Sequence, residues 1–126
     1  MIRHEALGRD APTGGRVGYG AMVLEGAYGA VRSDGEGAQA IHRALDLGAT
    51  MIDTADGYGG GQNEIRVGAA LHGRRDDAFV ATKFGVIFEE NETGTEFPIG
   101  WEGLKLRING TPRYVAKALD ASLERV

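Results

Sequence analysis

Three short apolar stretches alternate with three segments of helical periodicity along this chain of 126 residues. Strands that alternate with helices favour a parallel sheet with right-handed crossover connections. The polar, turn-rich residues 1–15 precede the first stretch, and we expect them to form a short hairpin. The predicted fold is therefore α/β, with that hairpin followed by three βα units. The expected strands lie in residues 16–24, 49–55 and 77–84, and the expected helices lie between 33 and 48, at 64–72 and from 111 onward.

Local signals mark the ends of the expected helices. Each signal has a known geometry at a helix end, and four are present: a capping box, a glycine stop, an asparagine N-cap and a Thr-Pro start. The last helix is expected to bury one face. The residues concerned are Ser33 and Glu36 (capping box), Gly48 (stop), Asn63 (N-cap), Thr111 and Pro112 (start), and Val115, Leu119, Ser122 and Val126 (buried face).

The composition argues against several classes of protein. The chain is 42% apolar and 25% charged, as in an ordinary globular domain, and its net charge of −4 argues against nucleic-acid binding. No apolar run approaches the roughly 18 residues that span a bilayer, and the amino-terminal segment lacks the apolar core of a secretory signal. The absence of cysteine excludes disulfides and cysteine-ligated zinc, and it is consistent with a cytoplasmic protein. We assign no metal site.

Two of the expected strands end in side chains of opposite charge, Asp53 and Lys83. Ligands of parallel α/β folds bind at the carboxyl ends of the strands, where Tyr58 also falls. A nearby ammonium stabilises a phenolate, so an Asp–Lys–Tyr relay can act as a general acid toward a carbonyl oxygen. A structural ion pair, or two unrelated exposed side chains, would explain Asp53 and Lys83 equally well.

Other residues have both a functional and a structural interpretation. The glycines at 59–61 could form an anion-binding nest, but a tight turn after Tyr58 is the better explanation. Glu64 is expected to favour the positive end of its helix or to pair with a neighbour. The stretch 85–110 reads as a long polar loop, in which Phe97 and Trp101 either line a substrate pocket or fold inward as a plug.

Several motifs together resemble the aldo-keto reductase family, and most closely its pyridoxine-dehydrogenase-like and stress-protein-like microbial members. The most specific is the D-T-A-x-x-Y-G-x-G-x-x-E run, and the likeness covers nearly the whole chain. The similar segments are DTADGYGGGQNE with the following IRVGAALHGRRD, ATKFG at 81–85, VGYGAM, the Tyr-Gly pair at 28–29, and INGTPRYVAKALDASLERV.

This resemblance implies the amino-terminal portion of a (β/α)8 TIM barrel. It also implies an NADP(H)-dependent oxidoreductase that reduces an aldehyde or ketone to an alcohol. Tyr58 would be the proton donor, Lys83 the cation that activates it, and Asp53 the partner of Lys83. Gly20, Ala21, Met22 and Asp53 would lie against the cofactor, which supplies the hydride.

The chain also departs from the family pattern. The fourth catalytic residue of the family is a histidine after the fourth strand, whereas the histidines here are His4, His42 and His72. A TIM barrel needs about 250 residues and carries its phosphate site after strands 7 and 8. We therefore expect a partial barrel domain over 1–126 that looks truncated before the histidine and the cofactor-phosphate site. The alternative is a non-catalytic assembly module, self-associating or forming one half of a split enzyme.

Overall fold

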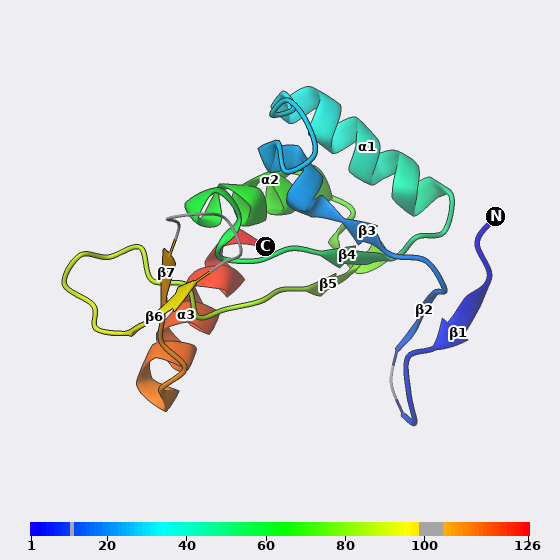
Figure 1. The fold of residues 1–126 in the computed structure, drawn as a ribbon. Helices are drawn as coiled ribbons and strands as arrows, with labels where there is room; N and C mark the ends of the chain where they lie inside the picture. Colours follow the sequence, from blue (N-terminus) through cyan, green and yellow to red (C-terminus); the bar gives the residue numbers. More distant parts are fainter. Residues whose placement is uncertain (11, 99–104) are drawn as a thin grey trace.

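The computed structural model describes residues 1–10, 12–98 and 105–126. Its elements alternate between strands and helices as the sequence predicts (Figure 1). No helix among these residues is long and apolar enough to cross a membrane. The elements are β1 (His4–Ala6), β2 (Thr13–Gly15), β3 (Tyr19–Gly20), η1 (Ala21–Glu25), α1 (Asp34–Asp46), β4 (Met51–Asp53), η2 (Tyr58–Gly61), α2 (Gln62–Leu71), η3 (Arg75–Asp77), β5 (Phe79–Ala81), β6 (Thr95–Pro98), β7 (Lys105–Ile108) and α3 (Pro112–Arg125).

The central sheet has the order β3-β4-β5, and both pairings are parallel. Gly20 on β3 and Ala81 on β5 both pair with Asp53 on β4, so all three strands end at the same level. The antiparallel hairpin β1–β2 lies at the amino ends of these strands, and the β6–β7 hairpin lies beyond their carboxyl ends (Figure 1). The parallel sheet predicted from the alternation of elements is confirmed.

Apolar side chains of α1, α2 and η1 pack over β4 and form the main core. The two helices lie together on one face of the sheet (Figure 1). Ile52 is the central residue of β4 and is fully buried among them. A second, smaller cluster joins the loop after β5 to α3 through Ile87, Tyr114 and Ala118. The main core comprises Ala21, Leu24, Ile41, Leu45, Ile52, Val67, Ala70 and Leu71.

The helix α1 has the predicted ends. The Ser33 hydroxyl accepts from the backbone N–H of Glu36, and the Glu36 carboxylate accepts from the backbone N–H of Ser33. Gly48 follows the helix with φ 94°, a conformation that glycine adopts without a steric penalty. Both signals act within a few residues, which is why they could be recognised in the sequence.

Several predicted boundaries differ from the structure. The strands β4 and β5 are shorter at both ends than the expected 49–55 and 77–84. The first strand, expected over 16–24, ends at Gly20, and the apolar residues after it form the 3-10 helix η1, which packs Ala21 and Leu24 into the core. The N-cap of α2 is Gly61, with φ 90°, and not Asn63. The Asn63 side chain instead forms hydrogen bonds with neighbouring elements in the core, and it cannot cap the helix from there.

The stretch expected to be a long loop contains a regular hairpin. Strands β6 and β7 pair antiparallel, with Thr95 opposite Ile108. Phe97 is half exposed on β6 and is therefore not an inward plug, and Trp101 lies outside the described residues. The buried face of α3 agrees with the predicted one only in part. Ser122 is buried and Val126 packs against the core, as predicted, but Leu119 is 48% exposed. Tyr114 and Ala118 are buried as well, because α3 turns its Tyr114 side toward the loop after β5.

Candidate active site

The ends of β4 and β5 bring Asp53 and Lys83 together. The Lys83 Nζ lies 2.6 Å from Asp53 Oδ1 and also donates to the backbone oxygen of Thr54 at 2.8 Å. The Asp53 and Lys83 side chains are 43% and 52% exposed, respectively. An ion pair this accessible contributes only about 0.2–1 kcal/mol to stability. Its importance is therefore in how it orients the ammonium, not in how much it stabilises the fold.

Two opposing effects act on the pKa of Lys83. Partial burial disfavours the ammonium and lowers the pKa, whereas the Asp53 carboxylate and the Tyr58 phenol beside it raise the pKa. The second effect is the larger in sum, so the pKa of Lys83 lies above its ordinary value. Lys83 is consequently a fixed cation at neutral pH.

Tyr58 begins η2, directly after the loop that leaves β4. The Lys83 Nζ lies 4.8 Å from the centre of the Tyr58 ring. Backbone hydrogen bonds hold the two loops in this relation, since the N–H of Thr54 donates to Ala81 and that of Asp56 donates to Lys83. The structure thus places the three side chains predicted to be catalytic in one cluster at the carboxyl ends of the strands.

The residues predicted to contact a cofactor differ in accessibility. Gly20 is exposed and lies opposite Asp53 in the sheet, with open space where a Cβ would be. Met22 is half-buried. Ala21 is fully buried in the core, and a ligand could reach it only after the side chains that cover it had moved. Gly20, Met22 and Asp53 therefore remain the accessible members of the predicted cofactor set.

Sequence reasoning missed a buried polar network beneath this cluster. Asn63 is fully buried, accepts from the Thr54 hydroxyl at 2.7 Å and donates to the backbone oxygen of Ala21 at 2.9 Å. Glu64, the next residue, is also fully buried and accepts from the Thr82 hydroxyl at 2.6 Å. The available signal was two polar residues in succession at the start of a helix that must pack on a sheet.

The glycines at 59–61 all have left-handed φ values, between 59° and 90°. A Cβ on Gly59 would lie 2.8 Å from the Glu25 carboxylate. That carboxylate also accepts from Asn63 and pairs with Arg66 at 3.3 Å. A carboxylate of the chain itself against these glycines disfavours a second anion there. The tight-turn interpretation therefore fits better than an anion-binding nest.

Two of the three histidines form hydrogen bonds with backbone oxygens, and the third is exposed. The His4 ring bonds the backbone oxygen of Gly48 at the amino ends of the strands, and the His42 ring bonds that of Ala70 between α1 and α2. His72 follows α2 as its C-cap and is exposed. His42 therefore helps to join the two helices, whereas His72 is solvated.

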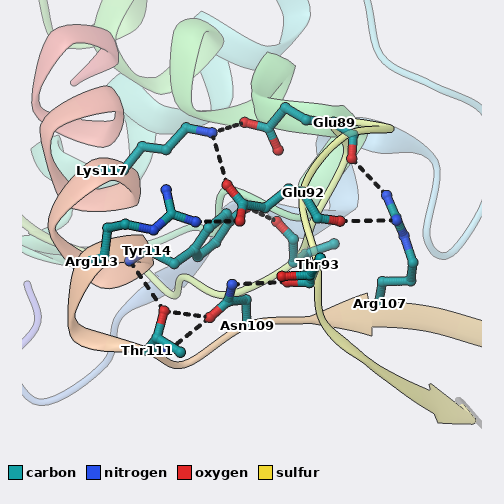
Figure 2. Close-up of polar contacts among 10 residues, drawn as sticks. Glu89, Glu92, Thr93, Arg107, Asn109, Thr111, Arg113, Tyr114 and Lys117 are labelled. Atoms are coloured by element: carbon teal, nitrogen blue, oxygen red, sulfur yellow. Dashed lines mark hydrogen bonds and ion pairs between the residues drawn. The ribbon is translucent and has the colours of Figure 1, made fainter.

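Ion pairs fasten the loop after β5 to α3, and hydrogen bonds fasten it to the β6–β7 hairpin (Figure 2). Lys117 on α3 pairs with Glu89 at 2.7 Å and with Glu92 at 3.6 Å, and Arg113 also pairs with Glu92. Arg107 on β7 donates to the backbone oxygens of Glu89 and Glu92 at 2.6 and 3.1 Å. The hydrogen bond from Lys117 lowers the pKa of Glu89. The loop that follows the cluster of Asp53, Tyr58 and Lys83 is therefore held in place at several points.

A cavity of about 230 Å³ lies beneath this loop. Asp56 forms part of its wall, and burial raises the pKa of that carboxyl although the backbone N–H of Gly85 donates to it at 3.0 Å. The cavity does not include Asp53, Tyr58 or Lys83 in its lining. Its lining residues are Asp56, Gly60, Val86, Phe88, Glu89, Tyr114, Lys117, Ala118, Ala121 and Arg125.

Known proteins resemble this chain in both sequence and structure. An NADP(+) aldo-keto reductase of Schizosaccharomyces pombe, yakc, is 41% identical over 113 residues, which are 87% of this chain and 29% of that protein. A probable aldo-keto reductase 1 of Glycine max is 34% identical over 127 aligned positions, covering 100% of this chain and 33% of that protein. The holo structure of aldo-keto reductase AKR11C1 from Bacillus halodurans superposes with a TM-score of 0.77 at 30% identity, over 99% of this chain and 36% of that one.

This chain therefore spans about a third of the length of these relatives. The solved relatives are TIM barrels, so the prediction of three βα units from a (β/α)8 barrel is confirmed. The model of the aldo/keto reductase family matches residues 16–126, which include every residue of the candidate site. We conclude that the chain belongs to the aldo/keto reductase family.

Proposed function

We propose that this chain carries the proton-delivery residues of an NADP(H)-dependent reductase of aldehydes or ketones. The observation that supports the proposal most strongly is the arrangement of Lys83, with its Nζ 2.6 Å from the Asp53 carboxylate and 4.8 Å from the centre of the Tyr58 ring. An ion pair needed only for stability would not require a phenol beside the ammonium. Family membership and the NADP(+) in the name of the yeast relative support the cofactor assignment.

Each residue has a defined role in the proposed reaction. Tyr58 donates its phenolic proton to the carbonyl oxygen of the substrate, and the Lys83 ammonium stabilises the phenolate that remains. Asp53 holds the ammonium in place through its hydrogen bond. NADP(H), when bound, supplies the hydride that adds to the carbonyl carbon, so that hydride and proton together give the alcohol.

The accessible residues fit the nicotinamide end of this cofactor. The exposed backbone at Gly20 leaves open space beside Asp53, and Asp53 has an exposed carboxylate that can accept from a ribose hydroxyl. Gly20, Met22 and Asp53 would hold that end of the molecule. We also propose that the 126 residues alone do not turn over substrate, because the family's histidine and phosphate site belong to later strands of the barrel.

The proposal can be tested in a chimera in which residues 1–126 replace the aligned segment of the yeast relative. With NADPH and an aromatic aldehyde, we expect the chimera to consume NADPH and the isolated chain not to do so. Lys83→Met should abolish consumption in the chimera. Lys105→Met is the matched control, because Lys105 forms an exposed ion pair of the same 2.6 Å length with Glu96 outside the site. Equal activity of the two variants would refute the role assigned to Lys83.

A second candidate function is assembly with a complementary barrel half or with another copy of the chain. Both β3 and β5 are edge strands of the central sheet, and an unpaired edge is a template for association. Phe79 on β5 and Leu119 and Leu123 on α3 are 43%, 48% and 65% exposed, respectively. Size-exclusion chromatography with light scattering tests this function. A monomer that unfolds cooperatively would contradict it.

The cytoplasmic location expected from the composition also stays a proposal.

A further inference from the structure

The carboxylate of Glu64 is fully buried in the first turn of α2. A charged group in the core is costly unless it is paired and hydrogen-bonded. Both of its oxygens have partners, since Oε1 accepts from the Thr82 hydroxyl at 2.6 Å and Oε2 accepts from Arg125 at 2.7 Å. Glu64 therefore joins α2 to the end of β5 on one side and to α3 on the other.

Gly68 of α2 and Gly61, which caps α2, make room for Arg125 beside this carboxylate. A Cβ on Gly68 would lie 1.9 Å from the Arg125 backbone oxygen, and a Cβ on Gly61 would lie 3.0 Å from its guanidinium carbon. Side chains at these two positions would displace the arginine. The pair of Glu64 and Arg125 is therefore built into the packing of α2 against α3, and it places a guanidinium beside the buried carboxylate.

The other partner of Glu64 lies next to the catalytic cluster. Thr82 stands between Ala81, the last residue of β5, and Lys83. Backbone hydrogen bonds to the oxygens of Ala81 and Lys83 keep this segment extended along the residues that follow β4. Successive side chains of an extended segment point to opposite faces. A hydroxyl of Thr82 fixed toward α2 thus directs Lys83 away from α2, toward Asp53 and Tyr58.

We propose that Glu64 is a positioning residue for Lys83, acting through the Thr82 hydroxyl, while Arg125 balances its charge. The catalytic meaning of this assignment rests on the proposed function. The geometric part does not, because it concerns only where the Lys83 ammonium is held. Glu64 does not touch Asp53, Tyr58 or Lys83 in any hydrogen bond, and we assign it no direct part in the chemistry.

The test removes the hydrogen bond between Thr82 and Glu64 by substituting Thr82, so that the buried ion pair of Glu64 and Arg125 stays intact. Thr82→Val removes the hydroxyl without changing the shape of the side chain, and Thr82→Ser restores a hydroxyl. In the 126-residue chain, NMR titration of the Lys83 ammonium reports how firmly Asp53 and Tyr58 hold it. Asp53→Asn sets the scale, because it removes the carboxylate that accepts from Lys83.

We expect the pKa of Lys83 to fall in Thr82→Val by most of the decrease that Asp53→Asn produces, and to return in Thr82→Ser. In the Asp53→Asn background, Thr82→Val should have no further effect. A purely structural role for Glu64 predicts a lower free energy of unfolding in Thr82→Val with an unchanged pKa of Lys83, and this result would overturn the inference. Should Thr82→Val not fold, an unchanged Lys83 pKa in Glu64→Gln would have the same meaning.

Failure of this inference can be told apart from failure of the proposed function. If the chimera is active but the pKa of Lys83 does not change in Thr82→Val, only the positioning role of Glu64 is refuted. If the pKa of Lys83 does change in Thr82→Val but the chimera is inactive, only the proposed function is refuted.

Discussion

Removal of the Asn63 side chain should be among the most destabilising single substitutions in this chain. Asn63→Ala leaves the Thr54 hydroxyl and the Ala21 backbone oxygen without their partner, and both residues are fully buried. Each buried polar group left unsatisfied costs about 1–3 kcal/mol. For two groups we expect a loss of about 2–6 kcal/mol in the free energy of unfolding. That is a large part of the roughly 5–15 kcal/mol that stabilises an ordinary domain.

The assay is equilibrium unfolding in urea, followed by circular dichroism. Asn91→Ala is the control, because Asn91 is exposed and such substitutions change stability by no more than about 0.5 kcal/mol. Thr54→Val should partly rescue Asn63→Ala, since it removes the hydroxyl that has lost its acceptor. We expect a coupling energy of about 0.5–3 kcal/mol between the two sites. Additive effects, or a cost for Asn63→Ala as small as that of the control, would refute the reasoning.

Two further predictions concern close packing and an ion pair. Gly68→Ala should lower the free energy of unfolding by about 1–3 kcal/mol, because its Cβ would meet the Arg125 backbone oxygen. Gly35→Ala, in open space on α1, should raise it by about 0.4–1 kcal/mol. Urea unfolding measures both, and a stabilising Gly68→Ala would contradict the packing described. The pKa of Glu89 is lowered from 4.5 by the hydrogen bond from Lys117, so the stability that this pair adds is present above pH 4.5 and is lost as the pH falls through the lowered pKa. Below pH 4.5 the free energy of unfolding should thus fall more steeply in the wild type than in Lys117→Met, and equal slopes would count against the pair.

The parts of the fold that were predicted correctly are those determined by neighbouring residues. The capping box of Ser33 and Glu36 acts within a single turn, and Gly48 supplies its own left-handed conformation. The grouping of Asp53 with Lys83 followed from the rule that parallel strands end at one edge of the sheet. The register of β4 and β5 agrees with that rule.

The parts that were missed depend on contacts between distant residues. Asparagine is a residue type preferred at helix N-caps, but hydrogen bonds with Thr54 and Ala21 place Asn63 inside the core. The sequence predicts that Glu64 favours the positive end of its helix or pairs with a neighbour. Its burial depends on Thr82 and on Arg125, which lies 61 positions away. The β6–β7 hairpin is exposed along β6 and at the ends of β7, and hydrogen bonds of Arg107 join it to the loop after β5, so no apolar pattern could reveal it.

The central claim is that Tyr58 delivers a proton, and the rate of NADPH consumption by the chimera tests it most directly. Tyr58→Phe should lower that rate by about 10²–10⁴-fold, the usual contribution of a general acid. Tyr114→Phe removes a phenol hydroxyl of equal size that donates to Val86 outside the site, and it should leave the rate unchanged. If Tyr58→Phe is as active as Tyr114→Phe, the assignment of Tyr58 as the proton donor is wrong.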